Sequence, residues 1–292
     1  MRDVIEPGML LVDKPAGISS FAALSRLRPS FGRKLGHAGT LDPFATGLLV
    51  VLTGRATRLA SLLVGADKTY DATIRFGFRS TTDDPEGALV ATELTTGALE
   101  IQATLPSLTG AIQQVPPAAS AIHIDGERAY RRFRRGEDVT VPARAVMVHS
   151  FSLLRFDPTT QTAEVRISCG SGTYIRSLAR DLGDLLGCGA YLTALRRTTV
   201  GRFSLQAAAP LQAIVDAPAG TVAWSSATTA VGHLPQRLLD HNECTIVGHG
   251  GRVAAAAEQQ GPIVLVNAEG RLIAIGDADG TVVSPRIVLE AC

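Results

Sequence analysis

The sequence predicts a mixed α+β protein with a smaller β-rich domain at its C-terminal end. Over the first 205 residues, alternating strand patterns are interleaved with segments that have apolar residues at helical spacing. From residue 261 onward, three short apolar runs are separated only by turns that contain Gly. These two observations indicate a mixed sheet with flanking helices, followed by a small β-barrel or β-sandwich unit.

The individual elements follow from the local patterns of the first domain. Strands are predicted for MLLVDKP, LLVVL at 48–52, TYDATIRFGF, VMVHSFSLLRF and TAEVRISCG. Helices are predicted for SSFAALSRLRP, RATRLASLLVG, TTGALEIQATLPSLTG and SLARDLGDLLG, the last of which ends at Gly187. The acidic turn TTDDPEG separates two of these elements.

Composition places the domain boundary near residue 232. The segment 206–232 is rich in Ala, Pro and Thr, which is typical of a linker or a loosely packed connection. We therefore predict a first domain over residues 1–232, with an arginine-rich insert at about 123–140, and a second domain over residues 233–292.

The overall composition is that of a folded protein that does not cross a membrane. Hydrophobic residues make up 46% and charged residues 19%, and no apolar run approaches the roughly twenty residues of a membrane span. The first residues, MRDVIEPGMLLVDKP, have charges and prolines where a signal peptide has its apolar core. A cytoplasmic location is expected.

The cysteines and histidines give no pattern of metal binding. Cys169, Cys188, Cys244 and Cys292 form no C-x-x-C pair, and the six histidines form no H-E-x-x-H motif. The glycine-rich GSGTYIR and GCGAYL lack the full phosphate-binding patterns. Reduced, mostly buried thiols are expected, and neither a metal nor a nucleotide cofactor is predicted.

The arginines are concentrated in one short segment although the net charge is only +1. Basic residues comprise 25 Arg and 3 Lys. Arginine binds phosphates through a planar fork and stacks on bases, so a cluster favours RNA as a partner. A solvated helix face is the alternative. The clustered residues are Arg128, Arg131, Arg132, Arg134 and Arg135.

The segment GHAGTLDPFATG at 36–47 contains the first candidate catalytic residue. Asp42 lies between Leu41 and the Pro43-Phe44 pair, so its carboxyl group has apolar neighbours. Burial raises the pKa of a carboxyl group unless a cation compensates. A structural role, in which Asp42 only caps an Asp-Pro turn, is the alternative.

Arg176 in CGSGTYIRSLARDLG is the candidate cation. Tyr174 and Arg176 are two residues apart and would share a face if the preceding strand continued through them. Arg176 would then keep Asp42 ionised, and Tyr174 would offer a face on which a flipped base can stack. In the alternative, Tyr174 is a core residue and Arg176 pairs with Asp181 or Asp184 at the surface.

Five ordered blocks resemble the TruB class of tRNA pseudouridine synthases. They are LVDKPAGISS, GHAGTLDPFATGLLVVLTGRATRL, DKTYDATIRFG, PPAASAIHIDGERAYRRFRRGE, and CGSGTYIRSLARDLG with YLTALRRT. From the first block to the last, the match spans residues 11–198, which is most of the chain. The tail from about 233 is similar to the PUA-type RNA-binding module of that family. In one departure, His123 stands where the family more often has Lys, so a contact there would be weaker or pH-dependent.

The resemblance implies a role for each matching residue. Asp42 corresponds to the catalytic aspartate, Tyr70 to the active-site tyrosine and Arg176 to the arginine that pairs with the aspartate. The residues implied to contact the substrate or to support its pocket are Tyr174 and Leu195 around the uracil, His37 in the T loop, and Lys14 with Pro15 beside the pocket.

The implied activity is isomerisation of uridine 55 in the T loop of tRNA, after base flipping and without a cofactor. Asp42 would act as a nucleophile or as the base of a glycal route, and both routes stay open. The arginine-rich insert would bind backbone phosphates of the T stem-loop. A monomer without guide RNA is expected, although a guide-dependent dyskerin-like enzyme and an RNA-binding or RNA-folding factor without chemistry are alternatives.

Overall fold

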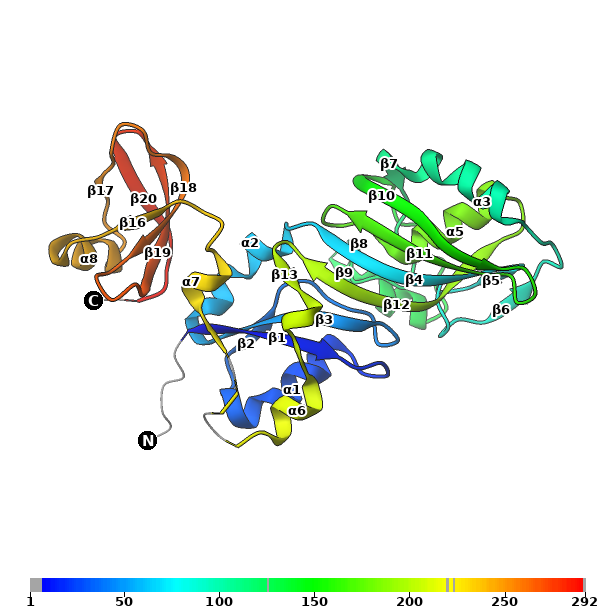
Figure 1. Ribbon diagram of the computed structural model, residues 1–292, viewed down its shortest axis with the longest axis horizontal. Coiled ribbons are helices and arrows are strands. Elements are labelled where there is room, and N and C mark those ends of the chain that lie inside the picture. The colour runs from blue at the N-terminus through cyan, green and yellow to red at the C-terminus, as the bar shows by residue number, and fades with distance from the viewer. Residues whose placement is uncertain (1–6, 125, 219–220, 223, 291–292) are drawn as a thin grey trace. The chain divides into compact units, whose positions relative to one another are not determined.

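The computed structural model describes residues 7–124, 126–218, 221–222 and 224–290 of the 292-residue chain (Figure 1). Contacts divide the chain into two compact units. The first unit contains the described residues up to Asp42, Leu48–Val64 and those from Leu205 onward, and the second contains Pro43–Gly47 and Gly65–Ser204. The backbone therefore leaves the first unit twice and returns to it twice.

The N-terminal part of the first unit contains a small mixed sheet. Its strands are β1 (Gly8–Lys14), β2 (Leu35–His37), β3 (Thr46–Thr53), β14 (Ala209–Pro210) and β15 (Ser225–Ser226). The main order is β14-β1-β3, with β14 parallel to β1, β15 antiparallel to β1, and β2 antiparallel to β3. Every residue of β3 after its first is buried, which confirms the buried strand predicted at 48–52.

Helices flank this sheet. They are α1 (Ser20–Phe31), α2 (Ala60–Val64), α6 (Leu211–Asp216) and α7 (Ala227–Ala230), with 3₁₀ helices η1 (Gly54–Leu59) and η3 (Leu205–Ala207). The helix α1 begins where the Ser19 hydroxyl accepts the Ala22 N–H at 3.1 Å, and it buries Ala23, Leu24 and Leu27. This confirms the predicted first helix, whereas the helix expected over 55–65 begins as 3₁₀ turns.

The described part of segment 206–232 carries regular structure. Its first strand, β14, pairs with β1 through Val12 and Asp13, and β15 pairs with the start of β1 at Gly8 and Met9. Between these strands, α6 buries Leu211 and Ile214. An Ala, Pro and Thr composition suggested a linker, but strand pairs only two residues long have no periodicity that composition could reveal.

The C-terminal part of the first unit is a curled five-stranded sheet in the order β16-β18-β19-β20-β17. Its strands are β16 (Gln236–Leu238), β17 (Val253–Ala254), β18 (Gln260–Val266), β19 (Leu272–Asp279) and β20 (Val282–Val288). The three long strands are those predicted. The helix α8 (His241–Gly248), which was not predicted, starts at an Asp240–Glu243 capping box and packs Val247 into a core with Leu265 and Val283.

The second unit is built on a five-stranded antiparallel order, β12-β4-β11-β10-β7. These strands are β12 (Ala190–Val200), β4 (Lys68–Phe76), β11 (Thr162–Cys169), β10 (Arg144–Asp157) and β7 (Gly110–Gln114), and β13 (Phe203–Ser204) pairs with β12. Alternate residues of β4 from Lys68 to Phe76 are buried, so one face of this sheet is covered. The start of β3 pairs with β12 in parallel, so the sheet is mixed.

Two hairpins and a helical layer complete the second unit. The hairpins are β5 (Phe78–Ser80) with β6 (Leu89–Ala91) and β8 (His123–Ile124) with β9 (Glu127–Arg128); the helices are α3 (Ala98–Thr104), η2 (Leu105–Leu108), α4 (Ala129–Arg134) and α5 (Ile175–Leu185). The chain turns after α5 at Gly187, whose φ is +73°. This confirms the predicted helix end, because a left-handed conformation favours glycine.

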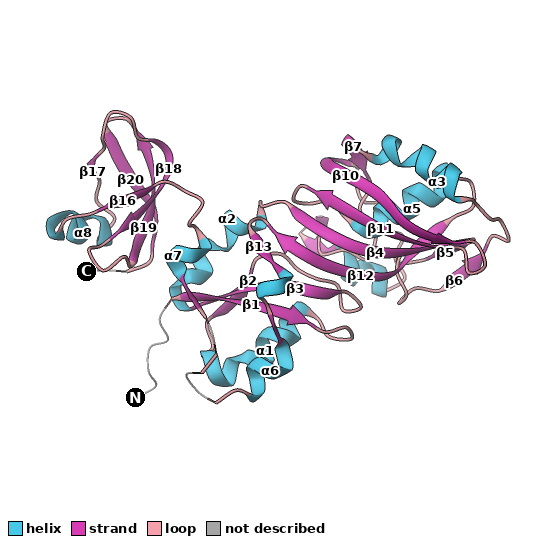
Figure 2. Cartoon of the chain, viewed as in Figure 1, coloured by secondary structure: helices cyan, strands magenta, loops and turns pink. Residues whose placement is uncertain are grey.

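The fold class predicted from the sequence is confirmed. Helices and strands occur together along the chain. Each of the two units contains a β-sheet as well as helices (Figure 2). Cys169, Cys188 and Cys244 are buried as expected, and Cys292 lies outside the described residues. Across the described part of the chain, no helix combines the length and the apolar character needed to cross a membrane.

Candidate active site

Asp42 lies in the loop between β2 and β3, and the preceding residue is fixed by α1. The Ser20 hydroxyl accepts the Leu41 N–H at 2.9 Å and donates to the Leu41 carbonyl at 3.1 Å. Leu41 is buried and Asp42 is half-buried, as the apolar neighbours in the sequence suggested. His37 ends β2, where it pairs with Val51 and is also half-buried. The loop that carries Asp42 is therefore held by a buried hydroxyl group.

The residues that follow Asp42 approach β12 closely. Gly47 has a φ of +101°, and a Cβ atom at this position would lie 2.3 Å from the Arg197 carbonyl oxygen. Only glycine tolerates both the conformation and the contact. The side chain of Thr46 also donates to the Leu195 carbonyl at 3.5 Å. Just after the loop that carries Asp42, β3 thus lies so close to β12 that residue 47 must be glycine.

The side chain of Lys14 stabilises the backbone turn that follows β1. Its side chain is fully buried, and Nζ donates to the carbonyl groups of Pro15 and Ile18 at 2.8 and 2.7 Å. These two bonds close the turn between β1 and α1. A buried ammonium group needs such acceptors, because leaving it without them would cost several kcal/mol or more. The geometry agrees with a supporting role for the Lys14–Pro15 pair, which stays a prediction with respect to the substrate.

Tyr70 and Leu195 share the covered face of the second unit's sheet. Tyr70 is 8% exposed and lies in register with Ile167 and Arg197 on the two neighbouring strands. Leu195, 7% exposed, lies opposite Ala72, the next inward residue on β4. The helix α5 packs on β12. Both side chains therefore point to the same, buried face of this sheet.

Arg176 belongs to the first turn of α5, so the strand expected to continue through residues 174–176 ends earlier than predicted. Its guanidinium is 2.9 Å from the carboxylate of Asp84, and both side chains are 5% exposed. Two further N–H groups donate to the carbonyl groups of Thr82 and Ala119, at 3.0 and 3.1 Å. The pairing of Arg176 with Asp42 stays a prediction.

The alternative partners considered for Arg176 are bound elsewhere. Asp181 accepts from Arg180 at 2.8 Å, and Asp184 lies 2.5 Å from Arg79. Arg176 is buried and not at the surface, so the surface ion pair with Asp181 or Asp184 is not what this helix forms. In the buried ion pair with Asp84, both charged groups have lost their hydration. Each therefore depends on the other for its stabilisation.

The acidic turn TTDDPEG supplies the counter-charges of α5. Asp84 also accepts from the Thr82 hydroxyl at 2.5 Å and from the Glu86 N–H at 3.0 Å. Its neighbour Asp83, at φ +61°, lies 2.9 Å from Arg180. Burial raises the pKa of Asp83 to about 6, while the charges of Arg180 and Arg176 act in the opposite direction. The turn is thereby locked to α5 by two arginines.

Tyr174 is held by its backbone and covered by an arginine. The side-chain amide of Gln114 donates to the Tyr174 carbonyl at 3.1 Å, and its oxygen accepts the Tyr174 N–H at 2.8 Å. The guanidinium carbon of Arg144 lies 4.9 Å from the centre of the Tyr174 ring. The ring is half-buried and not a core side chain. The Arg144 guanidinium thus occupies one face of the Tyr174 ring in a cation–π contact.

The arginine-rich segment divides into two groups. Arg132 pairs with Glu137 at 2.8 Å, and Arg135 pairs with Glu127 at 2.6 Å and with Glu137 at 2.7 Å. Hydrogen bonds from both arginines lower the pKa of Glu137. The remaining three, spaced three residues apart, are exposed and have no ion pair with a described carboxylate: Arg128, Arg131 and Arg134.

Several residues that position the candidate site were not predicted from the sequence. Asp84 could have been suspected, because TTDDPEG places two adjacent carboxylates in one turn. Ser20 lies in the LVDKPAGISS block without a visible signal for its role. Gln114 carries no signal at all, because it acts on a segment 60 residues away.

Comparison with known proteins places the chain in a family. Residues 28–175 match the model of the TruB family pseudouridylate synthase N-terminal domain, and residues 176–228 match that of the tRNA pseudouridylate synthase B C-terminal domain. Two proteins named tRNA pseudouridine synthase B are similar over most of the chain. That of Arthrobacter sp. (strain FB24) is 44% identical over 94% of this chain and 94% of its own length. That of Synechococcus sp. (strain WH7803) is 42% identical over 97% and 98%.

Solved structures support the fold. A Cbf5-Nop10-Gar1 complex contains a chain with a TM-score of 0.75 and 25% identity over 98% of this chain and 86% of that one. An H/ACA RNP bound to a substrate RNA containing 2′-deoxyuridine gives a TM-score of 0.73 and 23% identity over 97% and 84%. With both family models and full-length relatives in agreement, the chain belongs to the TruB family of pseudouridylate synthases.

Proposed function

We propose that this enzyme isomerises uridine 55 in the T loop of tRNA to pseudouridine, with Asp42 as the catalytic carboxylate. The observation that carries the proposal is the position of Asp42. It is half-buried in a loop that Ser20 fixes on one side and that Gly47 constrains on the other. A carboxylate held in this way is pre-organised, which is what a nucleophile or base requires.

The reaction breaks two bonds of the uracil base and forms two others. The N1–C1′ glycosidic bond of the uridine breaks, the uracil turns, and C5 bonds to C1′ while the C5 proton is lost and N1 gains a proton. No electron is transferred, so no cofactor is required. Asp42 acts either on C1′ or as a base that starts a glycal route, and both demand an ionised carboxylate.

The neighbouring residues receive roles by family resemblance. Arg176 keeps Asp42 ionised, Tyr70 stacks on the uracil and takes part in moving the C5 proton, and Tyr174 and Leu195 line the uracil pocket. His37 enters the T loop as the base flips out, and Lys14 supports the pocket. Flipping costs a few kcal/mol, which stacking on aromatic rings offsets.

The role of the C-terminal sheet, the cellular location and the RNA partner are inferred from the same resemblance. The C-terminal sheet is a PUA-type RNA-binding module, and the enzyme works in the cytoplasm as a monomer on tRNA without a guide RNA. Incubation of the full chain with an unmodified tRNA transcript, followed by mapping of pseudouridine at single-nucleotide resolution, tests the proposal. We expect one modified position, uridine 55. A transcript that stays unmodified unless a second RNA is added would favour the guide-dependent alternative.

The five arginines of the arginine-rich segment should contribute unequally to RNA binding, depending on whether a glutamate already pairs with them. We expect the triple change of Arg128, Arg131 and Arg134 to Gln to weaken tRNA binding and to reduce the slope of log Kd against log salt by about 2.1–2.7, at about 0.7–0.9 for each phosphate that is no longer neutralised. The double change of Arg132 and Arg135 to Gln should reduce the slope less, because Glu127 and Glu137 already neutralise them.

Binding of a tRNA transcript at several salt concentrations measures both slopes. The matched control is Glu127→Gln, which removes one acidic partner of Arg135 and should not reduce the slope. Equal slopes for the triple and the double variant would contradict the division of the segment.

A further inference from the structure

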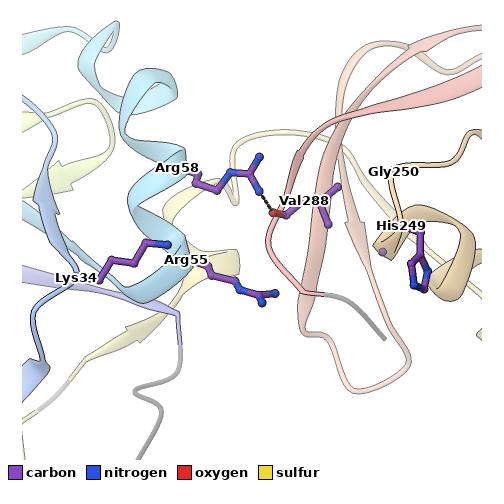
Figure 3. A pocket seen from close by; sticks show the side chains of 7 residues that line it. Lys34, Arg55, Arg58, His249, Gly250 and Val288 are labelled. Carbon is purple, nitrogen blue, oxygen red and sulfur yellow. Dashed lines mark hydrogen bonds between the residues drawn. The ribbon is translucent and has the colours of Figure 1, made fainter.

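A basic cleft lies within the first unit, where the end of the C-terminal sheet meets η1 (Figure 3). Its volume is about 500 Å³, and Lys34, Arg55, Arg58, His249 and Val288 are among the residues that line it. The four polar side chains are exposed. The described residues that line the cleft include no carboxylate. The positive charge is therefore not neutralised from within its own lining.

The helix η1 places two of the arginines side by side. A 3₁₀ helix has three residues per turn, so Arg55 and Arg58 project from the same side. Arg55 Nη1 donates to the Leu289 carbonyl at 2.9 Å, and Arg58 donates to the Val288 carbonyl. A guanidinium has five N–H donors, so these contacts with neutral acceptors leave donors for a charged ligand. Lys34 lies beside them, because its carbonyl accepts the Gly54 N–H at 2.8 Å.

His249 reaches the cleft from the end of α8. Its Nδ1 lies 2.8 Å from the Thr245 carbonyl, so this nitrogen carries the proton and the bond fixes the ring. The N–H groups of Gly250 and Gly251 donate to the carbonyls of Val247 and Ile246, at 2.9 and 2.8 Å. These bonds satisfy carbonyl groups in the last turn of α8, which would otherwise present negative charge to the cleft.

We propose that the basic cleft binds a backbone phosphate of the RNA substrate, at a place distinct from the arginine segment and from Asp42. The inference rests on the proposed function. Three like charges held close together are unfavourable unless an anion joins them. Arginine forks and a lysine point charge are the groups that recognise phosphate. Because Arg55 and Arg58 also contact the end of β20, a bound phosphate links RNA binding to the attachment of the C-terminal sheet.

The test compares two cleft variants with a matched control. Lys34→Gln removes one charge and leaves both arginine contacts with the β20 end in place. Lys34→Gln with Arg58→Gln removes two charges. Arg286→Gln, in the same sheet but paired with Asp277 at 2.9 Å and outside the cleft, is the control. Binding of an unmodified tRNA transcript is measured at several salt concentrations, and thermal unfolding shows whether each variant is folded.

We expect the slope of log Kd against log salt to fall by about 0.7–0.9 for Lys34→Gln and by about twice that for the double variant. The control should keep the wild-type slope. Unchanged slopes in both cleft variants, or an equal fall in Arg286→Gln, would overturn the proposal. If the double variant fails to fold, the Lys34→Gln slope alone decides.

Two further measurements separate the possible outcomes. Wild-type pseudouridine formation is followed on the same transcript; its absence would contradict the proposed function without altering the comparison of slopes. Titration of the RNA-free full chain with inorganic phosphate identifies the source of the phosphate. Saturable phosphate binding that Lys34→Gln abolishes, together with unchanged RNA slopes, would assign the cleft to a free phosphate-containing ligand and overturn its assignment to RNA.

Discussion

Asp42→Asn should abolish pseudouridine formation while tRNA binding persists. The change keeps the size of the side chain but removes the charge that either a nucleophile or a base needs, so we expect a loss of at least about 1,000-fold in single-turnover rate. Binding should not weaken, because RNA is a polyanion and a negative charge has been removed. Single-turnover assays with excess enzyme and equilibrium binding, both on a T stem-loop transcript, measure the two quantities separately.

Asp71→Asn is the matched control for this variant. Asp71 follows Tyr70 on β4 but points to the opposite, partly exposed face, where it pairs with Arg166 at 2.7 Å. The same isosteric loss of charge should leave the rate near that of the wild type. Turnover retained by Asp42→Asn would refute the assignment of the catalytic carboxylate, and loss of binding would show that Asp42 acts in recognition instead.

Asp84→Ala should produce the largest loss of stability. It removes the buried carboxylate 2.9 Å from the Arg176 guanidinium, and removing one partner of a buried ion pair costs about 3–5 kcal/mol in the free energy of unfolding. Activity should fall as well, since Asp84 holds the arginine that we propose to act on Asp42. Urea unfolding gives the free energy, and assays below the unfolding transition give the rate.

Asp184→Ala provides the comparison on the same helix. Asp184 pairs with Arg79, but the two side chains are 43% and 53% exposed, and exposed ion pairs contribute at most about 1 kcal/mol. Equal stability of the two variants would mean that the Arg176–Asp84 pair does not hold α5 to the acidic turn. Asp84→Asn, which keeps hydrogen bonding, should be intermediate.

The sequence predicted most elements because their patterns are local. The buried run of β3 and the alternation of β4 were visible without any knowledge of their partners. Predictions failed where long-range contacts decide the structure. Residues 174–176 have a strand-like alternation, yet Arg176 lies in the first turn of α5, where its guanidinium pairs with Asp84, 92 residues away in the sequence. Similarly, β14 and β15 exist only as partners of β1.

Some residues of the candidate site could likewise be predicted from the sequence, whereas others could not. Family blocks located Asp42, Tyr70 and Arg176, which are chemically conspicuous. The residues that hold Leu41, next to Asp42, and Tyr174, two residues before Arg176, are ordinary in type. Ser20 and Gln114 act through backbone groups of distant segments, and no spacing rule connects a hydroxyl in α1 with the N–H and carbonyl of Leu41. Such contacts become visible only in three dimensions.

The pairing of β1 also has a consequence for synthesis on the ribosome. This strand is synthesised before both of its short partners, β14 and β15, which lie beyond residue 208. Until they emerge, one edge of β1 offers unpaired backbone groups, the kind of surface that promotes association between nascent chains. Most of the second unit comes from one continuous stretch, Gly65–Ser204, and can fold meanwhile. The pairing of β1 is thus completed only after the stretch Gly65–Ser204 has been synthesised.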